Sequence, residues 1–456
     1  MPDLQTFSAK DFPNLKTIHF PGPDGSGSHV LRSMQTDTGQ LLWAEESAPL
    51  GPPGRTAAQR SEHQESLSID ADDPDILRVL APPLSSTIEA ANFNTNSTHT
   101  GFFFIPPDPI AAAGPNHVVN VVNVTVEWYT KAGVQQNSQS LASFFSALPA
   151  PLPRTFTFDP KVIYDQYNDR FVIVTLEQTD TAAGDPANTS FIFLAVSDDS
   201  DPNGTWYQQV ITSTVMISST DHWADYPGLA VDDEAIYITN NMFTFGTFIP
   251  GGVRLWIVDK GAGSGGLYDG GTSTVSIHNP YASGGWPVTT QPAHMFGTAP
   301  SGVGTFLVGY SGLNLGGNEY IQVVRVDDPL GTPTFPRQSV NAGNIDNTAT
   351  GMPDAPQLGS ATAIEANDRR ALQAVWRDDS LWLTAQVVPP SGGDAGQATA
   401  HWFQLDTTNL GSLSLADQGN AGGNDIDAGA YTFMPSIMVD QNGSMALGFA
   451  LSSPNH

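Results

Sequence analysis

Residues 162–174 read VIYDQYNDRFVIV, an apolar run, a polar turn and a second apolar run. Residues 229–238, LAVDDEAIYI, repeat this plan with an acidic turn between the two apolar runs. Residues 436–443, SIMVDQNG, place an Asn-Gly pair directly after an apolar run. Polar turns, and Asn-Gly pairs above all, favour tight connections between antiparallel strands. The sequence therefore predicts β-hairpins along much of the chain.

A second pattern recurs with the hairpins. Four apolar or β-branched stretches each end on an aspartate, and they lie roughly 60 to 80 residues apart. These stretches are residues 194–198, 256–259, 324–327 and 403–406. A strand pattern that recurs with hairpins at a long period is typical of propeller blades. We therefore predict an all-β protein, a β-propeller of six or seven four-stranded blades, with a β-sandwich as the alternative fold.

The predicted domain organisation has two parts. Residues 1–90 contain few periodic segments and form an extended N-terminal arm or lead-in segment, whereas residues 91–456 form the propeller. The last hairpin is followed by too few residues to complete a four-stranded blade. Two explanations stay open: the arm supplies a strand that closes the ring, or the chain is truncated.

Composition narrows the functional classes. The chain of 456 residues has 46 acidic and 17 basic residues, a formal net charge of −29, and no cysteine. So acidic a protein is a poor partner for nucleic acid, whose phosphates require clustered Lys and Arg. Disulfides are excluded, and no apolar run reaches the roughly 18 residues that a membrane span needs. With 39% apolar residues the chain can still bury a sizeable core.

The expected compartment is extracellular or the cell surface. Low lysine, a strong acidic excess and many Asn, Thr, Ser and Gly residues are typical of exported proteins. The first residues, MPDLQ, lack the basic and apolar regions of a signal peptide, so we expect that the leader is absent from this chain.

Three motifs carry a resemblance to a known group. Residues 106–119, 158–162 and 200–207 resemble segments of secreted bacterial β-propeller proteins, most of them uncharacterised. The third motif also resembles a degenerate Asp-box, a structural turn of sialidase-type propellers. The resemblance implies a propeller in an extracellular setting, and it implies no particular activity.

Aspartates near the predicted first strands are candidate metal ligands. Asp108, Asp159 and Asp225 precede or enter such strands, and equivalent positions of a propeller gather around its axis at one mouth. Converging carboxylates can bind Ca²⁺ through their oxygens. The alternative is that each carboxylate caps a turn by accepting backbone N–H bonds.

A separate segment imitates the start of a calcium-binding loop. Asp199, Asp201 and Asn203 place oxygens at alternate positions before Gly204, but Val210 stands where a bidentate carboxylate is required. A complete EF-hand is therefore excluded. A plain turn or a weak Ca²⁺ site remains, so Ca²⁺ is the cofactor that the sequence suggests.

Candidate catalytic residues lie before two predicted strands. They are His222, Asp225, Tyr226 and His294. A histidine and a tyrosine at one mouth can act as base and acid in polysaccharide β-elimination, and paired carboxylates suit glycoside hydrolysis. Simple hydrogen-bonded or solvated histidines are the alternative.

Aromatic residues offer a possible sugar-binding surface. Trp223 and Trp286 fall in predicted loops and could stack on sugar rings, although burial between blades is the alternative for either. We interpret the chain as an extracellular, non-catalytic binding or scaffold propeller that presents loops to a glycan or protein partner. The alternative function is a glycan-active enzyme, a polysaccharide lyase or glycoside hydrolase, acting at the propeller mouth.

Overall fold

The predicted hairpins are present. In the computed structural model, β9 (Thr157–Asp165) pairs antiparallel with β10 (Arg170–Thr179), and β14 (Thr220–Val231) pairs with β15 (Ala235–Thr244). The pair β30 (Tyr431–Val439) and β31 (Met445–Ser452) turns through Gly443, whose φ of 78° favours glycine. The structure describes residues 16–21, 28–35, 41–45, 87–104, 106–148, 157–179, 187–287 and 289–455.

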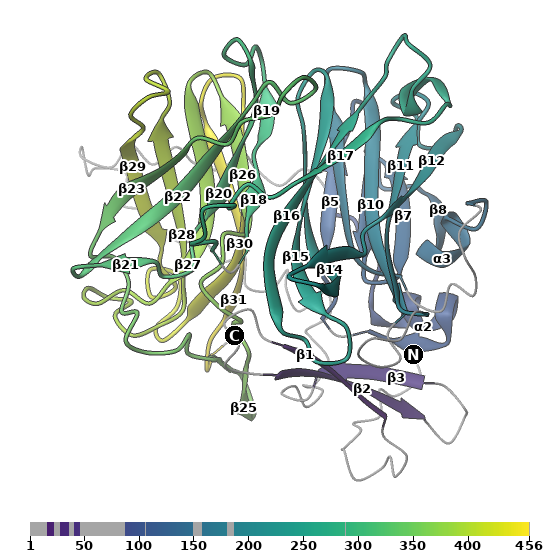
Figure 1. Ribbon diagram of the computed structural model, residues 1–456. Coiled ribbons are helices and arrows are strands. Elements are labelled where there is room, and N and C mark those ends of the chain that lie inside the picture. Colours follow the sequence, from purple (N-terminus) through teal and green to yellow (C-terminus); the bar gives the residue numbers. More distant parts are fainter. Residues whose placement is uncertain are drawn as a thin grey trace.

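The hairpins extend into blades that stand side by side (Figure 1). Blade 1 is formed by the four strands β5 (Ile110–Ala113), β6 (His117–Val122), β7 (Thr125–Thr130) and β8 (Gln135–Ser140). In blade 2, β9 and β10 are followed by β11 (Thr189–Ser197) and β12 (Trp206–Thr212). Blade 3 surrounds β14 and β15 with β13 (Val215–Ile217), β16 (Pro250–Asp259) and β17 (Val275–His278).

Two further sheets follow in the chain. Blade 4 contains β18 (Gln291–Pro292), β20 (Val303–Gly309), β21 (Asn314–Leu315), β22 (Asn318–Asp327) and β23 (Arg337–Gly343). Blade 5 contains β19 (His294–Phe296), β26 (Gln373–Arg377), β27 (Ser380–Val387), β28 (Thr399–Asp406) and β29 (Ser414–Ala421). A small pair, β24 (Ala355–Gln357) and β25 (Ser360–Ile364), lies outside the blades.

The protein is therefore an all-β, five-bladed β-propeller, and the prediction of six or seven four-stranded blades is wrong. Three of the five sheets have a fifth strand. The sequence count included the hairpin β30–β31 as a unit, but this hairpin forms a two-stranded sheet that packs against β26, β27 and β28 of blade 5. The periodic sequence pattern identifies hairpins, but it does not show which hairpins pair with further strands to form a blade.

The aspartate-ended pattern identifies one strand of the blade. Asp259, Asp327 and Asp406 are the last residues of β16, β22 and β28, and Asp198 directly follows β11. In each case the strand pairs with the second strand of its hairpin on one side and with an outer strand on the other. The repeat predicted from sequence is thus present in blades 2 to 5, as the strand that lies next to the outer strand.

The arm is described in part. β1 (Lys16–Pro21), β2 (Ser28–Gln35) and β3 (Leu41–Glu45) form an antiparallel sheet, and β3 pairs in parallel with β4 (Phe102–Phe103). The rest of residues 1–86 lies outside the described residues. Closure of the ring by the arm therefore stays a prediction, as does the domain boundary at residue 90.

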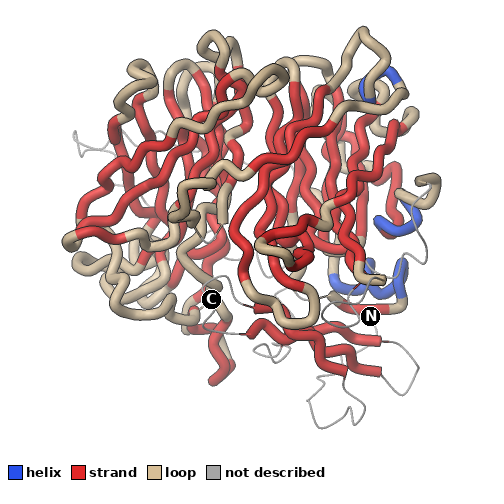
Figure 2. Tube along the Cα trace, in the orientation of Figure 1, coloured by secondary structure: helices blue, strands red, loops and turns tan. Residues whose placement is uncertain are grey.

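Large side chains fill the spaces between blades. Trp223 of blade 3 is fully buried against Phe158 of blade 2, with ring centroids 6.2 Å apart, and against Phe243. Burial of such aromatic surface is a main source of stability in sheet-to-sheet contacts. Helices are few and short (Figure 2), with α2 (Phe93–Thr100) the longest that is described. No helix among the described residues is long and apolar enough to cross a membrane.

Candidate functional site

Irregular backbone recurs in the first strands of the hairpins. Asp159, Tyr226 and Met434 have φ of 48°, 46° and 51°, each precedes a proline, and at each the strand register shifts. Asp108 has the same conformation, with φ of 41°, just before β5. Non-glycine residues at positive φ cost about 1–3 kcal/mol each and cluster at functional sites. These bulges turn side chains out of the regular alternation of the strand.

The bulges of three neighbouring blades meet. Backbone N–H of Asp159 donates to Oδ1 of Asn123 at 2.7 Å, and Nδ2 of Asn123 donates to Oδ2 of Asp108 at 2.5 Å. Oδ2 of Asp159 in turn accepts a hydrogen bond of 3.1 Å from the backbone N–H of Tyr226. A continuous chain of hydrogen bonds therefore runs from blade 1 through blade 2 to blade 3, with Asp159 at its centre.

Asp108 and Asp225 lie close enough to Asp159 for their charges to act on it. Burial raises the pKa of Asp159 well above its ordinary value, and the negative charges of Asp108 and Asp225 raise it further. The Lys161 ammonium and the N–H of Tyr226 oppose this shift. All three aspartate residues are half-buried. Asp159 thus tends to hold a proton beside two other carboxyl groups.

Two cations flank Tyr226 in the same region. The Lys161 ammonium lies 4.8 Å from the centre of the Tyr226 ring, and the Arg370 guanidinium lies 4.6 Å from it. Arg370 is buried and pairs with Asp368 at 2.9 Å. Burial alone would lower the pKa of Arg370, but Asp368, Tyr226 and Asp225 together raise it above its ordinary value. Lys161 of β9 in blade 2 and Arg370, in the segment that precedes β26 of blade 5, thus both lie beside Tyr226.

Sequence reasoning missed the residues that complete this cluster. Asn123 lies in the turn between β6 and β7, next to Val124 at φ of 66°, and its two hydrogen-bonding groups join two blades. Lys161 directly follows the Asp159-Pro160 pair in the sequence, so its position near Asp159 could have been predicted. Arg370 had no such signal, because it lies far along the chain and only the ring brings it to Tyr226.

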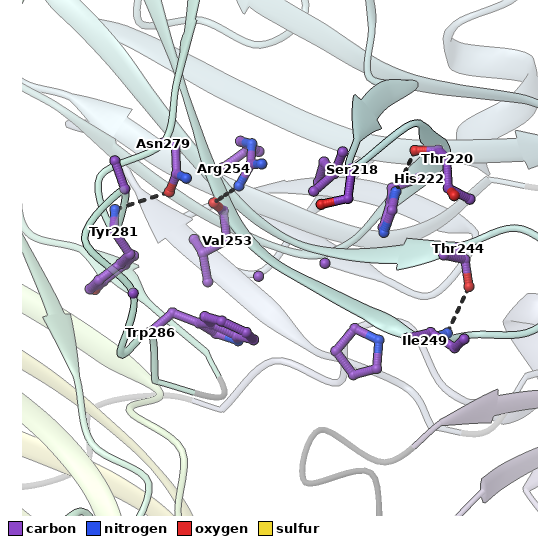
Figure 3. A pocket seen from close by; sticks show the side chains of 16 residues that line it. Ser218, Thr220, His222, Thr244, Ile249, Val253, Arg254, Asn279, Tyr281 and Trp286 are labelled. Atoms are coloured by element: carbon purple, nitrogen blue, oxygen red, sulfur yellow. Dashed lines mark hydrogen bonds between the residues drawn. The ribbon is translucent and has the colours of Figure 1, made fainter.

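His222 lies at the beginning of β14, three residues before Asp225, and is buried. Its Nδ1 is 2.8 Å from the carbonyl oxygen of Thr220, and burial lowers its pKa. His222 lines a pocket of about 480 Å³ in blade 3, together with Arg254 and Trp286 (Figure 3). It therefore belongs to a pocket on the same strand as Asp225, and it makes no described hydrogen bond with the aspartates.

His294 lies beside the end of β9, away from the aspartate cluster. Its Nε2 is 2.8 Å from Oε1 of Gln166, which follows the last residue of β9. Asp159 stands near the opposite end of β9, about 20 Å away at the rise of a strand. Burial, with the charges of Lys260 and Arg377, lowers the pKa of His294 to about 3. The structure therefore does not bring His294 to Asp225 and Tyr226.

The acidic turn between β11 and β12 hydrogen-bonds to itself. Oδ1 of Asp199 accepts the N–H of Asp201 at 2.7 Å, and Oδ1 of Asp201 accepts the N–H of Asn203 at 3.0 Å. Oδ1 of Asn203 accepts a hydrogen bond from Trp128. These contacts are those of capped turns. Across the described residues, no group of three or more His, Asp or Glu side chains is placed to hold a metal ion. Calcium binding stays a prediction.

Trp223 and Trp286 differ in their exposure to solvent. Trp223 is core, whereas the Trp286 side chain is 46% exposed in the loop that follows β17. Trp286 therefore remains available to a ligand.

Comparisons with known proteins found fold-level similarity. An exo-1,5-α-L-arabinanase from a bovine ruminal metagenomic library is 13% identical, with 68% of this chain and 96% of that chain covered and a TM-score of 0.33. A GH43 endo-arabinanase from Bacillus licheniformis is 16% identical, with coverages of 68% and 96% and a TM-score of 0.31. A polysaccharide lyase is 10% identical, with coverages of 66% and 58% and a TM-score of 0.37.

No protein-family model matches the sequence, and no curated protein matches it. At the identities and TM-scores of the solved structures, the resemblance does not establish an activity for this chain. None of these comparisons identifies an Asp-box in residues 200–207.

Proposed function

We propose that this protein is an extracellular glycan-active enzyme, a glycoside hydrolase, whose catalytic carboxyl groups are Asp159 and Asp225, with Asp108 as a positioning residue. The observation that carries the proposal is the meeting of these aspartates across three blades, with the pKa of one of them raised. Glycoside hydrolysis needs two carboxyl groups in different protonation states at one place. This is the enzymatic alternative of the sequence interpretation, and it replaces the non-catalytic scaffold as our leading function.

The raised pKa supports Asp159 as the general acid. A protonated Asp159 can donate its proton to the glycosidic oxygen as the bond to the leaving sugar breaks. The hydrogen bond from Tyr226 N–H and the one from its own N–H to Asn123 hold Asp159 in one orientation. Such fixed geometry is what proton transfer requires.

Asp225 is our candidate for the second role. It lies near the Arg370 guanidinium, whose pKa it helps to raise, and this interaction favours the ionised carboxylate. An ionised Asp225 would activate water or stabilise positive charge on the sugar ring. Asp108 accepts a hydrogen bond from Asn123 and raises the pKa of Asp159, which makes it a positioning residue.

The test uses polysaccharides and one activated substrate. Wild-type protein is incubated with arabinans, xylans and uronate-containing polysaccharides, and new reducing ends are measured. Asp159→Asn should lower the rate on polysaccharide by about 10²–10⁴-fold. On an aryl glycoside with a good leaving group, which needs no acid, the same variant should retain most activity, whereas Asp225→Asn should lose activity on both.

The matched control is Asp425→Asn, which changes an exposed aspartate to the same residue type. It should behave like the wild type on every substrate. Equal activity of Asp159→Asn and Asp425→Asn would refute the assignment. Products that carry a ring double bond, detected by ultraviolet absorbance, would show a lyase in place of a hydrolase.

A further inference from the structure

The pocket that contains His222 is lined by different chemical groups from those of the aspartate cluster. It is formed within blade 3 by the β13–β14 turn, the facing ends of β15 and β16, and the segment 279–286. In Figure 3 the indole of Trp286 lies across the pocket from Arg254 and His222. With a volume of about 480 Å³ the pocket lies within the range of small-ligand sites.

Trp286 is held as a flat platform. A Cβ atom at Gly252 would lie 3.6–3.8 Å from three atoms of the indole, so the indole packs directly on the backbone of β16. Gly252 has φ of 93°, a conformation that L side chains rarely adopt. With one part of the ring against the backbone and 46% of the side chain exposed, an aromatic surface faces outward. Such a surface stacks on the apolar face of a sugar ring.

Arg254 lines the same pocket as Gly252 and follows it by two residues in β16. The two residues alternate with Val253, which is buried, and a spacing of two residues in a strand is about 7 Å. That spacing is close to the span of one sugar ring with its substituent. A single sugar on the Trp286 platform can therefore extend a group to Arg254.

The charge of Arg254 has no carboxylate partner among the described residues. Its described hydrogen bond is 2.8 Å long, from Nη1 to the carbonyl oxygen of Val253. Burial lowers its pKa, with no neighbouring carboxylate raising it. This is unusual in a chain with 46 acidic and 17 basic residues, because a partly buried guanidinium normally finds an acid. Its remaining N–H donors match the two oxygens of a carboxylate.

Two polar side chains of the pocket, His222 and Asn279, offer hydrogen-bonding atoms to the hydroxyl groups of a sugar. With Nδ1 of His222 at the Thr220 carbonyl, the ring is neutral and presents Nε2 as an acceptor. Oδ1 of Asn279 accepts the N–H of Tyr281 at 3.1 Å, which leaves the Nδ2 group of Asn279 as a donor. One acceptor and one donor beside an aromatic platform suit vicinal hydroxyls.

We propose that this pocket binds a uronic acid residue of an acidic polysaccharide, with the sugar ring on Trp286 and its carboxylate on Arg254. The inference deepens the proposed function, because it names uronate-containing glycans as the substrate class. Binding itself does not depend on the carboxyl chemistry at Asp159. The two proposals can therefore fail independently.

The experiment is calorimetric titration of the full chain with oligomers of galacturonate, glucuronate and mannuronate, each compared with its methyl ester. Asp159→Asn is used so that turnover is slowed during the titration. At least one free acid should bind about 10- to 100-fold more tightly than its ester, because the ester removes the charge that Arg254 pairs with. Equal binding of acid and ester, or no binding of any oligomer, would overturn the proposal.

Variants connect the effect to the pocket. Arg254→Ala should lower the affinity for the acid about 10- to 100-fold and remove the difference between acid and ester, an effect that a general loss of structure would not produce. Lys131→Ala, which removes one positive charge from an exposed site, is the matched control and should bind as the parent does.

Trp286→Ala should weaken the binding of acid and ester alike, whereas Trp286→Phe should restore most of the affinity. An unchanged acid–ester difference in Arg254→Ala would refute the assignment. Hydrolysis by the protein with Asp159 intact, measured separately, reports on the proposed function alone.

Discussion

The backbone N–H of Tyr226 in blade 3 donates a 3.1 Å hydrogen bond to the carboxyl group of Asp159 in blade 2. Both residues stand at positive φ before a proline, so two matching bulges are joined directly. The bond holds the side chain of Asp159 beside Asp108 and Asp225, where burial and their charges raise its pKa. The same contact thus links the packing of the blades to the protonation of the site.

Asp159→Asn should stabilise the protein at neutral pH. Because the pKa of Asp159 is higher in the folded state, its contribution to stability is fully present below the unfolded pKa and is lost as pH rises through the folded pKa. The asparagine keeps an acceptor for Tyr226 N–H without the charge. We expect a gain of about 0.5–2 kcal/mol at pH 7 that disappears near pH 4, measured by denaturant unfolding. A loss of stability at pH 7 would contradict this account, and Asp425→Asn serves as the control.

Asn123→Ala should destabilise the contact between blades 1 and 2. The side chain is buried, and the change leaves the N–H of Asp159 and the carbonyl of Pro106 without their hydrogen bonds of 2.7 and 2.8 Å. We expect a loss of about 2–3 kcal/mol in denaturant unfolding. Asn442→Ala, in the exposed turn between β30 and β31, is the control and should cost much less. Equal effects of the two substitutions would argue against the bridging role.

Lys260→Met should be strongly destabilising. Lys260 Nζ is buried 2.6 Å from Oδ2 of Asp165 and also donates to the carbonyl oxygen of Asp232, so it joins blades 2 and 3. Removing one partner leaves the Asp165 carboxylate buried without a counter-ion, which costs about 3–5 kcal/mol. The double variant Lys260→Met with Asp165→Asn should recover part of the loss in thermal melts. No recovery would show that the charge pair is not the cause.

His294→Gln should reduce the acid sensitivity of the fold. The pKa of His294 is about 3 in the folded state and near 6.5 when unfolded. His294 therefore binds a proton in the unfolded chain but not in the folded chain. The free energy of unfolding falls as pH falls from 6.5 towards 3. Between pH 7 and pH 4.5 the wild type should lose about 2 kcal/mol more than the variant in denaturant unfolding. Parallel pH profiles would contradict the burial of a neutral His294.

If the predicted calcium binding is confined to the turn that holds Asp199 and Asp201, chelation should change the melting temperature little. The oxygens of Asp199 and Asp201 already accept backbone N–H bonds in their turn, and a bound ion would have to compete with them. Thermal melts with and without EDTA, followed by added Ca²⁺, check this expectation. A large drop on chelation that Ca²⁺ reverses would mean that the folded state binds calcium, because a ligand of the folded state alone stabilises by mass action.

Local features of the site could be predicted well. The proline that follows Asp108 or Asp159 marks an irregular strand, and propeller geometry implies that such positions gather at one mouth. The convergence of Asp108, Asp159 and Asp225 follows from these two facts. The grouping of His222 with His294 did not follow. His222 lies near the beginning of β14, whereas His294 begins β19 and contacts Gln166 beyond the end of β9.

The amino-acid sequence by itself determined the hairpins, the aspartates that end the strands next to the outer strands, and the breaks in the first strands of the hairpins. Each depends on a few adjacent residues, whose turn chemistry and alternation act over one or two strands. Only the tertiary structure decided that five blades form, that β30–β31 packs on blade 5, and that Arg370 reaches Tyr226. These outcomes depend on which surfaces far apart in the chain pack together, and no local pattern encodes the free energy of those contacts.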